Sequence, residues 1–168
     1  MANWVKKFQD IHIQDIPVVG GKNASLGEMI TTLASKGIKV PAGFATTADA
    51  FWHFIDSNKI REQLQGLMAR LDKSGFSNLA ETGRTARQLI LDATVPADVS
   101  SAVIQSYKEL CGDNYREVAV RSSATAEDLP DASFAGQHES YLNIKGEEAL
   151  LKAVQACFAS LYTDRAIK

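Results

Sequence analysis

A glycine pair followed by a lysine, Gly20-Gly21-Lys22, precedes a segment with helical periodicity. Glycines let the backbone approach a ligand closely, and the first N–H groups of a helix attract anions. Lys22 adds a full positive charge, so the segment has the residue types of a phosphate site. It is not a Walker A loop, because Ile16 replaces the first glycine and Asn23 replaces the Ser or Thr that would bind magnesium. By itself, a motif this short fits a glycine turn with a solvated lysine about twice as well.

Arg121 follows three apolar residues, Val118-Ala119-Val120, in a short run from Glu117 that has the composition of a β-strand. Strand ends are where sheets covered by helices often place ligand-binding groups. The guanidinium group offers a planar fork of donors that suits bidentate contact with phosphate. The alternative is an exposed arginine paired with Glu127 or Asp128, which would contribute only about 0–1 kcal/mol.

A third candidate is the loop segment Ser133-Phe134-Ala135-Gly136-Gln137. Small residues in a loop that leads into a strand suit a flap whose backbone N–H groups touch phosphate. Ser140 follows as a hydroxyl within reach of whatever that flap covers. The alternative is an ordinary connection between two strands, which the segment alone does not exclude.

The composition excludes several classes of protein. The chain has 168 residues, 45% of them hydrophobic and 23% charged, with a formal net charge of -2. These values are ordinary for a globular domain and exclude intrinsic disorder and a global attraction to nucleic acid. No segment is apolar enough for a membrane span or a signal peptide, which predicts a cytoplasmic protein. Cys111 and Cys157 match no metal-binding spacing and are expected to be reduced thiols. His12 and His53 each lie between apolar residues in the sequence and are expected to be packing residues.

The apolar periodicities predict a helix-rich α+β chain with a small mixed sheet that carries Arg121 and the flap. Residues 1–112 form the helix-rich part, with Gly37 ending the first long helix and a capping box of Thr46 and Asp49 opening the next. For residues 113–168 the pattern predicts a strand, a flap, a second strand and a helix, in that order. The last helix runs almost to Lys168 without a cap, so we expect a piece of a longer protein.

Five segments, taken together and in order, resemble the phosphoenolpyruvate synthase (pyruvate, water dikinase) family. They are VGGKNASLGE (19–28), VPAGFATT (40–47), VRSSATAED (120–128), SFAGQ (133–137) and SLYTDRAI (160–167). The resemblance covers almost the whole chain and is much more specific than any one segment.

The resemblance implies the N-terminal portion of an ATP-grasp-type nucleotide-binding domain. In that family ATP pyrophosphorylates a histidine, water removes one phosphate, and the other passes to pyruvate, which yields phosphoenolpyruvate, AMP and phosphate. By motif, Lys22 and Arg121 would contact the ATP phosphates, and Gly136 would offer its backbone to them. Gln137 in the same flap and Ser140 complete the expected ATP site. Ser140 stands where relatives commonly have threonine, and Glu139 where they have aspartate.

The phosphohistidine motif, the second half of the ATP-grasp domain and the pyruvate-binding barrel are not in the sequence. We therefore expect no catalytic residue in this chain, and expect the Mg²⁺ ligands of MgATP to lie outside it. The implied partners are ATP and, in a full-length homodimeric enzyme, pyruvate, with no nucleic acid and no membrane. Alternatives are a pyruvate, phosphate dikinase, a rifampin-type phosphotransferase, or a non-catalytic nucleotide-binding module. The flap with Gln137 favours the synthase or the rifampin-type branch over the phosphate dikinase.

Overall fold

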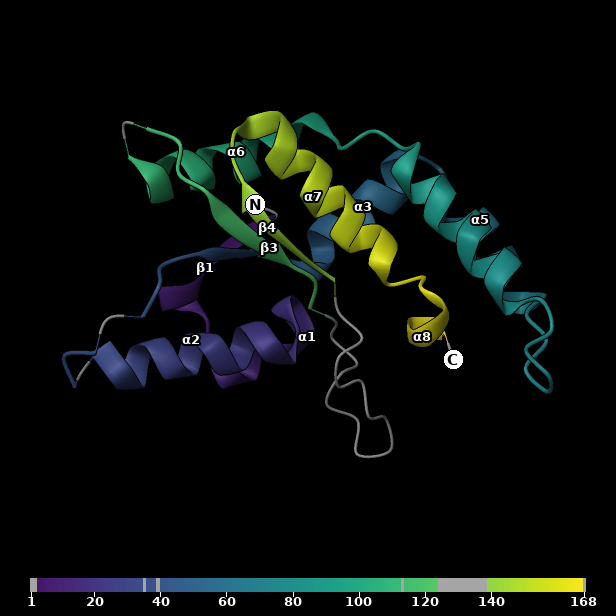
Figure 1. The fold of residues 1–168 in the computed structure, drawn as a ribbon, viewed down its shortest axis with the longest axis horizontal. Helices are drawn as coiled ribbons and strands as arrows, with labels where there is room; N and C mark the ends of the chain where they lie inside the picture. The colour runs from purple at the N-terminus through teal and green to yellow at the C-terminus, as the bar shows by residue number, and fades with distance from the viewer. Residues whose placement is uncertain (1–2, 35, 39, 113, 124–138, 168) are drawn as a thin grey trace. The chain divides into compact units, whose positions relative to one another are not determined.

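The structure is a computed structural model that describes residues 3–34, 36–38, 40–112, 114–123 and 139–167 (Figure 1). The chain passes alternately through two compact units. The first unit contains the described residues of Met1–Trp52 and Ala97–Arg116, together with Ser123. The second contains His53–Pro96, Glu117–Ser122 and the described residues of Phe134–Lys168.

The first unit contains a two-stranded antiparallel sheet, in which β1 (Val5–Lys7) pairs with β2 (Phe44–Thr46). Between the two strands the chain forms two short 3-10 helices and then two α-helices. They are η1 (Phe8–Asp10), η2 (Ile13–Asp15), α1 (Ile16–Val19) and α2 (Gly21–Ala34). The helix α6 (Ala97–Cys111) packs against β1. A small core joins these elements and consists of Ile11, Val19, Ala24 and Ala45, with Phe8 and Ile16 against it.

The helix α2 turns its smallest residues inward. Its buried positions, spaced three apart on one helical face, are Gly21, Ala24 and Gly27. A Cβ atom on Gly27 would lie 2.3 Å from the carbonyl oxygen of Ile11, so only glycine permits this close approach. The larger apolar residues of α2 are less covered: Leu26, Ile30 and Leu33 are half-buried, and Met29 is 50% exposed.

Two predicted helix boundaries have different outcomes. Gly37 has φ +75°, and the N–H of Ile38 donates to the carbonyl of Leu33, as expected for a glycine just beyond a helix C-terminus. The predicted capping box with Thr46 is wrong by one residue, because Thr46 belongs to β2. The hydroxyl of Thr47 accepts from the N–H of Ala50 and begins α3 (Ala48–Ser57). α3 starts in the first unit and ends in the second.

The second unit combines helices with a β-ribbon, the antiparallel pair β3 (Val118–Arg121) and β4 (Ser140–Ile144). Its helices are α4 (Arg61–Ala69), α5 (Leu79–Leu91), α7 (Glu147–Ser160) and α8 (Asp164–Ile167). α7 packs against both strands on one side and against α5 on another, an arrangement visible in Figure 1. The core includes Phe54 and Phe158, whose ring centroids are 5.5 Å apart.

The helix-rich α+β prediction is confirmed, with two corrections. The described residues form two separate two-stranded antiparallel sheets and not one small mixed sheet. The last helix does not run to the end of the chain. It stops at Ser160, where Leu161–Thr163 form a turn before the short α8. Among the described residues, no helix combines the length and the apolar character needed to cross a membrane.

Candidate functional site

The ribbon of β3 and β4 has one covered face and one open face. Side chains alternate along a strand, so Val118, Val120 and Tyr141 are half-buried on the side of α7. We define the open face as the four exposed residues that point the other way, Ala119, Arg121, Ser140 and Leu142. Leu142 is 62% exposed. The alternation is interrupted by a bulge between Tyr141 and Ile144, where Asn143 has φ +56°.

Arg121 and Ser140 are brought together on the open face. They are directly opposite partners in the antiparallel register, although they are far apart in the sequence. Directly opposite residues project to the same face with Cβ atoms about 4.5–5.5 Å apart. The guanidinium donors of Arg121 and the hydroxyl of Ser140 can therefore reach one ligand. A cationic fork beside a neutral donor is suited to an anionic oxygen cluster such as a phosphate.

Beyond this pair, two hydrogen bonds join Ser122 and Glu139, the last residues of the ribbon that the structure describes. The N–H of Ser122 donates to the carbonyl of Glu139 at 3.2 Å. The N–H of Glu139 donates to the hydroxyl oxygen of Ser122 at 3.1 Å. Ser122 is only 4% exposed, whereas Glu139 is exposed, so this contact is partly buried.

Lys22 lies in the first turn of α2, in the first unit. Gly20 separates α1 from α2 with φ +82°, and the carbonyl of Gly20 accepts the first helical bond, from the N–H of Ala24. The side chain of Asn23 donates to the carbonyl of Val19 at 2.8 Å, which further fixes the turn. The predicted glycine turn at the start of a helix is confirmed. The phosphate role of Lys22 stays a prediction.

The remaining predicted site residues, Gly136 and Gln137, lie outside the described residues, as does the whole segment 133–137. The same holds for Glu127 and Asp128, the alternative partners of Arg121. The ATP-site assignments of Gly136 and Gln137 therefore remain predictions.

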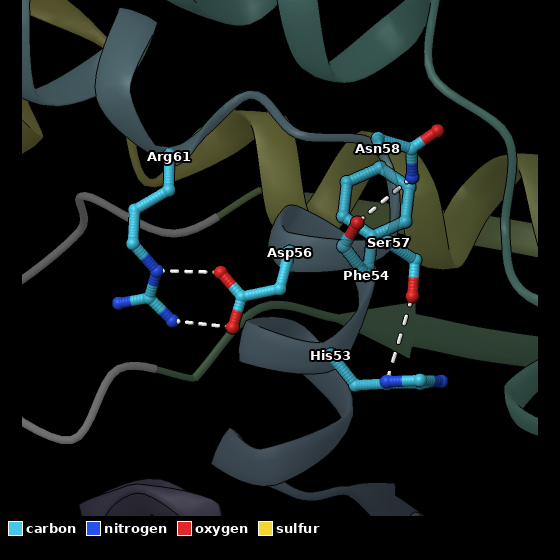
Figure 2. Close-up of polar contacts among 6 residues, drawn as sticks. All are labelled: His53, Phe54, Asp56, Ser57, Asn58 and Arg61. Atoms are coloured by element: carbon cyan, nitrogen blue, oxygen red, sulfur yellow. Dashed lines mark hydrogen bonds and ion pairs between the residues drawn. The ribbon is translucent and has the colours of Figure 1, made fainter.

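His12 and His53, both expected to pack against apolar neighbours, differ in how far they are buried. His12 is exposed, and its backbone N–H donates to the Asp15 carboxylate at 2.8 Å, so the packing expected for its side chain is wrong. His53 is half-buried on α3, with Nδ1 3.5 Å from the hydroxyl of Ser57 (Figure 2). Figure 2 also shows Asp56 receiving a two-pronged contact from Arg61, which holds the pKa of that carboxyl below its usual value. These contacts lie at the C-terminal end of α3 and in the turn that follows it.

A cavity of about 540 Å³ lies within the second unit, between the α7 side of the ribbon and the helices α5, α7 and α8, and sequence reasoning missed it. Its charged and polar lining includes Arg87, Glu139, Tyr141, Asp164 and Arg165. Nη1 of Arg87 donates to the Tyr162 carbonyl at 2.7 Å and lies 3.5 Å from Asp164, contacts that tie α5 to the turn before α8. Ser160, Thr163, Asp164 and Arg165 of the lining belong to the segment SLYTDRAI (160–167), but that segment was assigned no site from the sequence. The other lining residues come from segments far apart in the chain, so only the folded structure shows the cavity.

With this geometry in place, comparison with known proteins places the chain in a family. Residues 16–168 match the family described as pyruvate phosphate dikinase, AMP/ATP-binding domain. The chain belongs to this family, as its resemblance to phosphoenolpyruvate synthases led us to expect.

Several relatives carry a more specific name. The chain is 48% identical to a phosphoenolpyruvate synthase of Synechocystis sp. over 167 residues, which cover 95% of this chain and 20% of the relative. It is 47% identical to the phosphoenolpyruvate synthase of Escherichia coli over 161 residues, or 95% of this chain and 20% of the relative. A probable phosphoenolpyruvate synthase of Methanocaldococcus jannaschii is 46% identical over 163 residues, again 95% of this chain but 13% of the relative. The chain thus spans a fifth or less of the length of these relatives.

Proposed function

We propose that this chain is the N-terminal ATP-binding part of a phosphoenolpyruvate synthase and belongs to an ATP-grasp-type domain. The observation that carries the proposal is the cross-strand pair of Arg121 and Ser140 on the open face, in a chain 46–48% identical to relatives of that name. The phosphohistidine and pyruvate-binding domains belong to the rest of the complete enzyme. That enzyme would act on pyruvate in the cytoplasm as a homodimer, as the sequence resemblance implies.

In this proposal five residues of the chain bind or orient ATP. Arg121 donates to phosphate oxygens in a bidentate manner, and Ser140 donates its hydroxyl from the opposite strand. Lys22 supplies a point charge from the start of α2, where the helix dipole also favours an anion. Gly136 and Gln137 would add contacts from the flap.

We assign the Mg²⁺ ligands of MgATP to parts of the complete enzyme outside this chain, as the family resemblance implies. Among the described residues, no group of three or more His, Cys, Asp or Glu side chains could hold a metal ion. The contribution of this chain is the binding of the phosphates, and no step of the reaction is assigned to its side chains.

The test of the proposal is the reaction of the complete enzyme. Purified enzyme with MgATP and pyruvate is expected to form phosphoenolpyruvate, AMP and inorganic phosphate in equal amounts. The absence of pyruvate-dependent AMP would contradict the proposal. A requirement for added phosphate, with pyrophosphate as product, would identify a pyruvate, phosphate dikinase, and AMP formation that depends on rifampin would identify the antibiotic-modifying branch.

A further inference from the structure

The pair Ser122–Glu139, the last one in the described part of the ribbon, uses a hydroxyl where a regular antiparallel ladder uses a backbone carbonyl. In an antiparallel hydrogen-bonded pair, the two residues exchange both of their N–H···O bonds. Ser122 makes the first of these bonds through its own N–H, at 3.2 Å from the Glu139 carbonyl. The return bond from the Glu139 N–H, at 3.1 Å, ends on the Ser122 hydroxyl. The chain can thus leave the ribbon at Ser122 while the Glu139 N–H keeps a partner.

This contact is adjacent to the pair that carries the open face. Arg121 and Ser140 lie between the pair Val120–Tyr141 on one side and Ser122–Glu139 on the other. Without the Ser122 hydroxyl, the neighbouring pair would keep the bond from the Ser122 N–H but lose the bond from the Glu139 N–H. Two-stranded ribbons are only marginally stable by themselves, so the loss of this bond is expected to loosen the adjacent pair.

We propose that Ser122 is a positioning residue for ATP binding, whose hydroxyl fixes the distance between the Arg121 and Ser140 side chains. This inference rests on the proposed function, because it assumes that the two side chains bind phosphate. Ser122 itself does not touch the ligand. Its side chain is buried, its hydroxyl accepts from the Glu139 N–H, and it acts through the backbone of the neighbouring pair.

The experiment measures the dissociation constant for MgATP by titration calorimetry with the complete enzyme. Ser122→Ala removes the acceptor of the Glu139 N–H and is expected to weaken MgATP binding by about two- to tenfold, the range that one lost hydrogen bond supports. Ser122→Cys keeps nearly the same volume but offers a weak acceptor, and a similar loss is expected. Thermal unfolding of each variant confirms that it is folded.

A control separates positioning from general destabilisation. Gln155 on α7 donates to the carbonyls of Ile90, Leu91 and Ala93 at the end of α5, in the same unit but away from the open face. Gln155→Ala removes these bonds and is expected to lower thermal stability while leaving the MgATP dissociation constant within twofold of wild type, roughly the precision of the titration. If Gln155→Ala weakens MgATP binding as much as Ser122→Ala does, the effect of Ser122 is general destabilisation and the inference is wrong.

A double-mutant cycle with Arg121 decides whether Ser122 acts through the pair. In an Arg121→Ala background, Ser122→Ala is expected to cause little further loss, because the side chain that it positions is gone. An undiminished loss in that background would overturn the inference. So would normal MgATP binding by Ser122→Ala when Arg121→Ala binds weakly. Normal binding by Arg121→Ala itself would instead contradict the proposed phosphate site.

Discussion

At the scale of single residues, the two cations assigned to phosphate obtain their positions in different ways. Arg121 is fixed by strand register, which places it opposite Ser140. Lys22 is fixed by a local turn, in which Gly20 adopts a positive φ and α2 begins. The first position depends on pairing between distant segments, whereas the second depends on adjacent residues.

Removing either cation is expected to weaken MgATP binding by the complete enzyme. Hydrogen bonds to charged groups contribute about 1.5–3 kcal/mol, so Arg121→Ala and Lys22→Ala should each raise the dissociation constant by about 10- to 150-fold. Equilibrium titration with MgATP measures the change. The control variants Arg84→Ala and Lys36→Ala remove exposed cations elsewhere and should bind as wild type does. If the variants at 121 and 22 also bind normally while folded, the assignment of the phosphate site is wrong.

At the scale of elements, the close approach between α2 and the Ile11 segment requires a glycine. Gly27→Ala would put a Cβ atom 2.3 Å from the Ile11 carbonyl oxygen and 2.7 Å from its Cβ. Relieving this overlap must move the helix, at an expected cost of about 1–3 kcal/mol in the free energy of unfolding. Urea denaturation followed by circular dichroism measures it.

The matched control is Gly66→Ala in α4. A Cβ atom there meets only the end of the Arg70 side chain, at 3.8 Å. Alanine should stabilise this helix by up to about 1 kcal/mol. Equal destabilisation of both variants would show that the close approach at Gly27 does not determine the outcome.

The loop between α4 and α5 depends on one carboxylate. Asp72 accepts hydrogen bonds from the backbone and hydroxyl groups of Ser74 and Ser77 and from the N–H of Gly75. These donors, led by the Ser74 hydroxyl, hold the pKa of Asp72 well below its ordinary value of 3.8. The folded loop therefore binds its proton less readily than the unfolded chain does, so the contribution to stability is complete above pH 3.8 and is lost as the pH falls below it.

Asp72→Asn tests this dependence. The amide offers only one acceptor oxygen, so the variant should be less stable than wild type at pH 7, with a difference that shrinks as the pH falls below 3.8. Urea titrations across that pH range measure the difference. Glu148→Gln, in an exposed pair with Lys152, serves as the control and should change stability little. A difference between wild type and Asp72→Asn that is constant with pH would contradict the role of the carboxylate.

At the scale of the whole molecule, each compact unit contains one buried thiol. Cys111 belongs to the first unit and Cys157 to the second, and neither forms a disulfide. Burial raises the pKa of Cys157 to about 12, so its thiolate is scarce at neutral pH. Both thiols should therefore resist alkylating and disulfide reagents until the surrounding structure opens.

Thiol labelling can report whether the two units open together. The chain passes between them repeatedly and α3 is shared, so we expect one cooperative transition. In single-cysteine variants, Cys111→Ser and Cys157→Ser, the remaining thiol should become reactive at the same urea concentration. A thiol that reacts at distinctly lower urea would show that its unit opens independently.

The sequence by itself determined the features that depend on neighbouring residues. The glycine turn before α2, the Gly37 terminus and the helical periodicities were predictable because backbone conformation and amphipathic spacing are local. The ordered motifs also indicated the family. Two helix boundaries were predicted wrongly. The N-terminal cap of α3 is Thr47 and not Thr46, and α7 ends at Ser160 instead of continuing toward Lys168. In both places the residue pattern permitted more than one boundary.

Only the tertiary structure decided which distant residues meet. The register that sets Arg121 opposite Ser140 depends on pairing across a long segment. The same register pairs Tyr141 with half-buried Val120, so Tyr141 faces the covered side and Leu142 the open side. Likewise, the hydroxyl of Ser122 is committed to Glu139 only because the two strand ends meet there. Strand pairing and close helix approach are determined by the packing of the whole chain, and no local pattern of residue types encodes them.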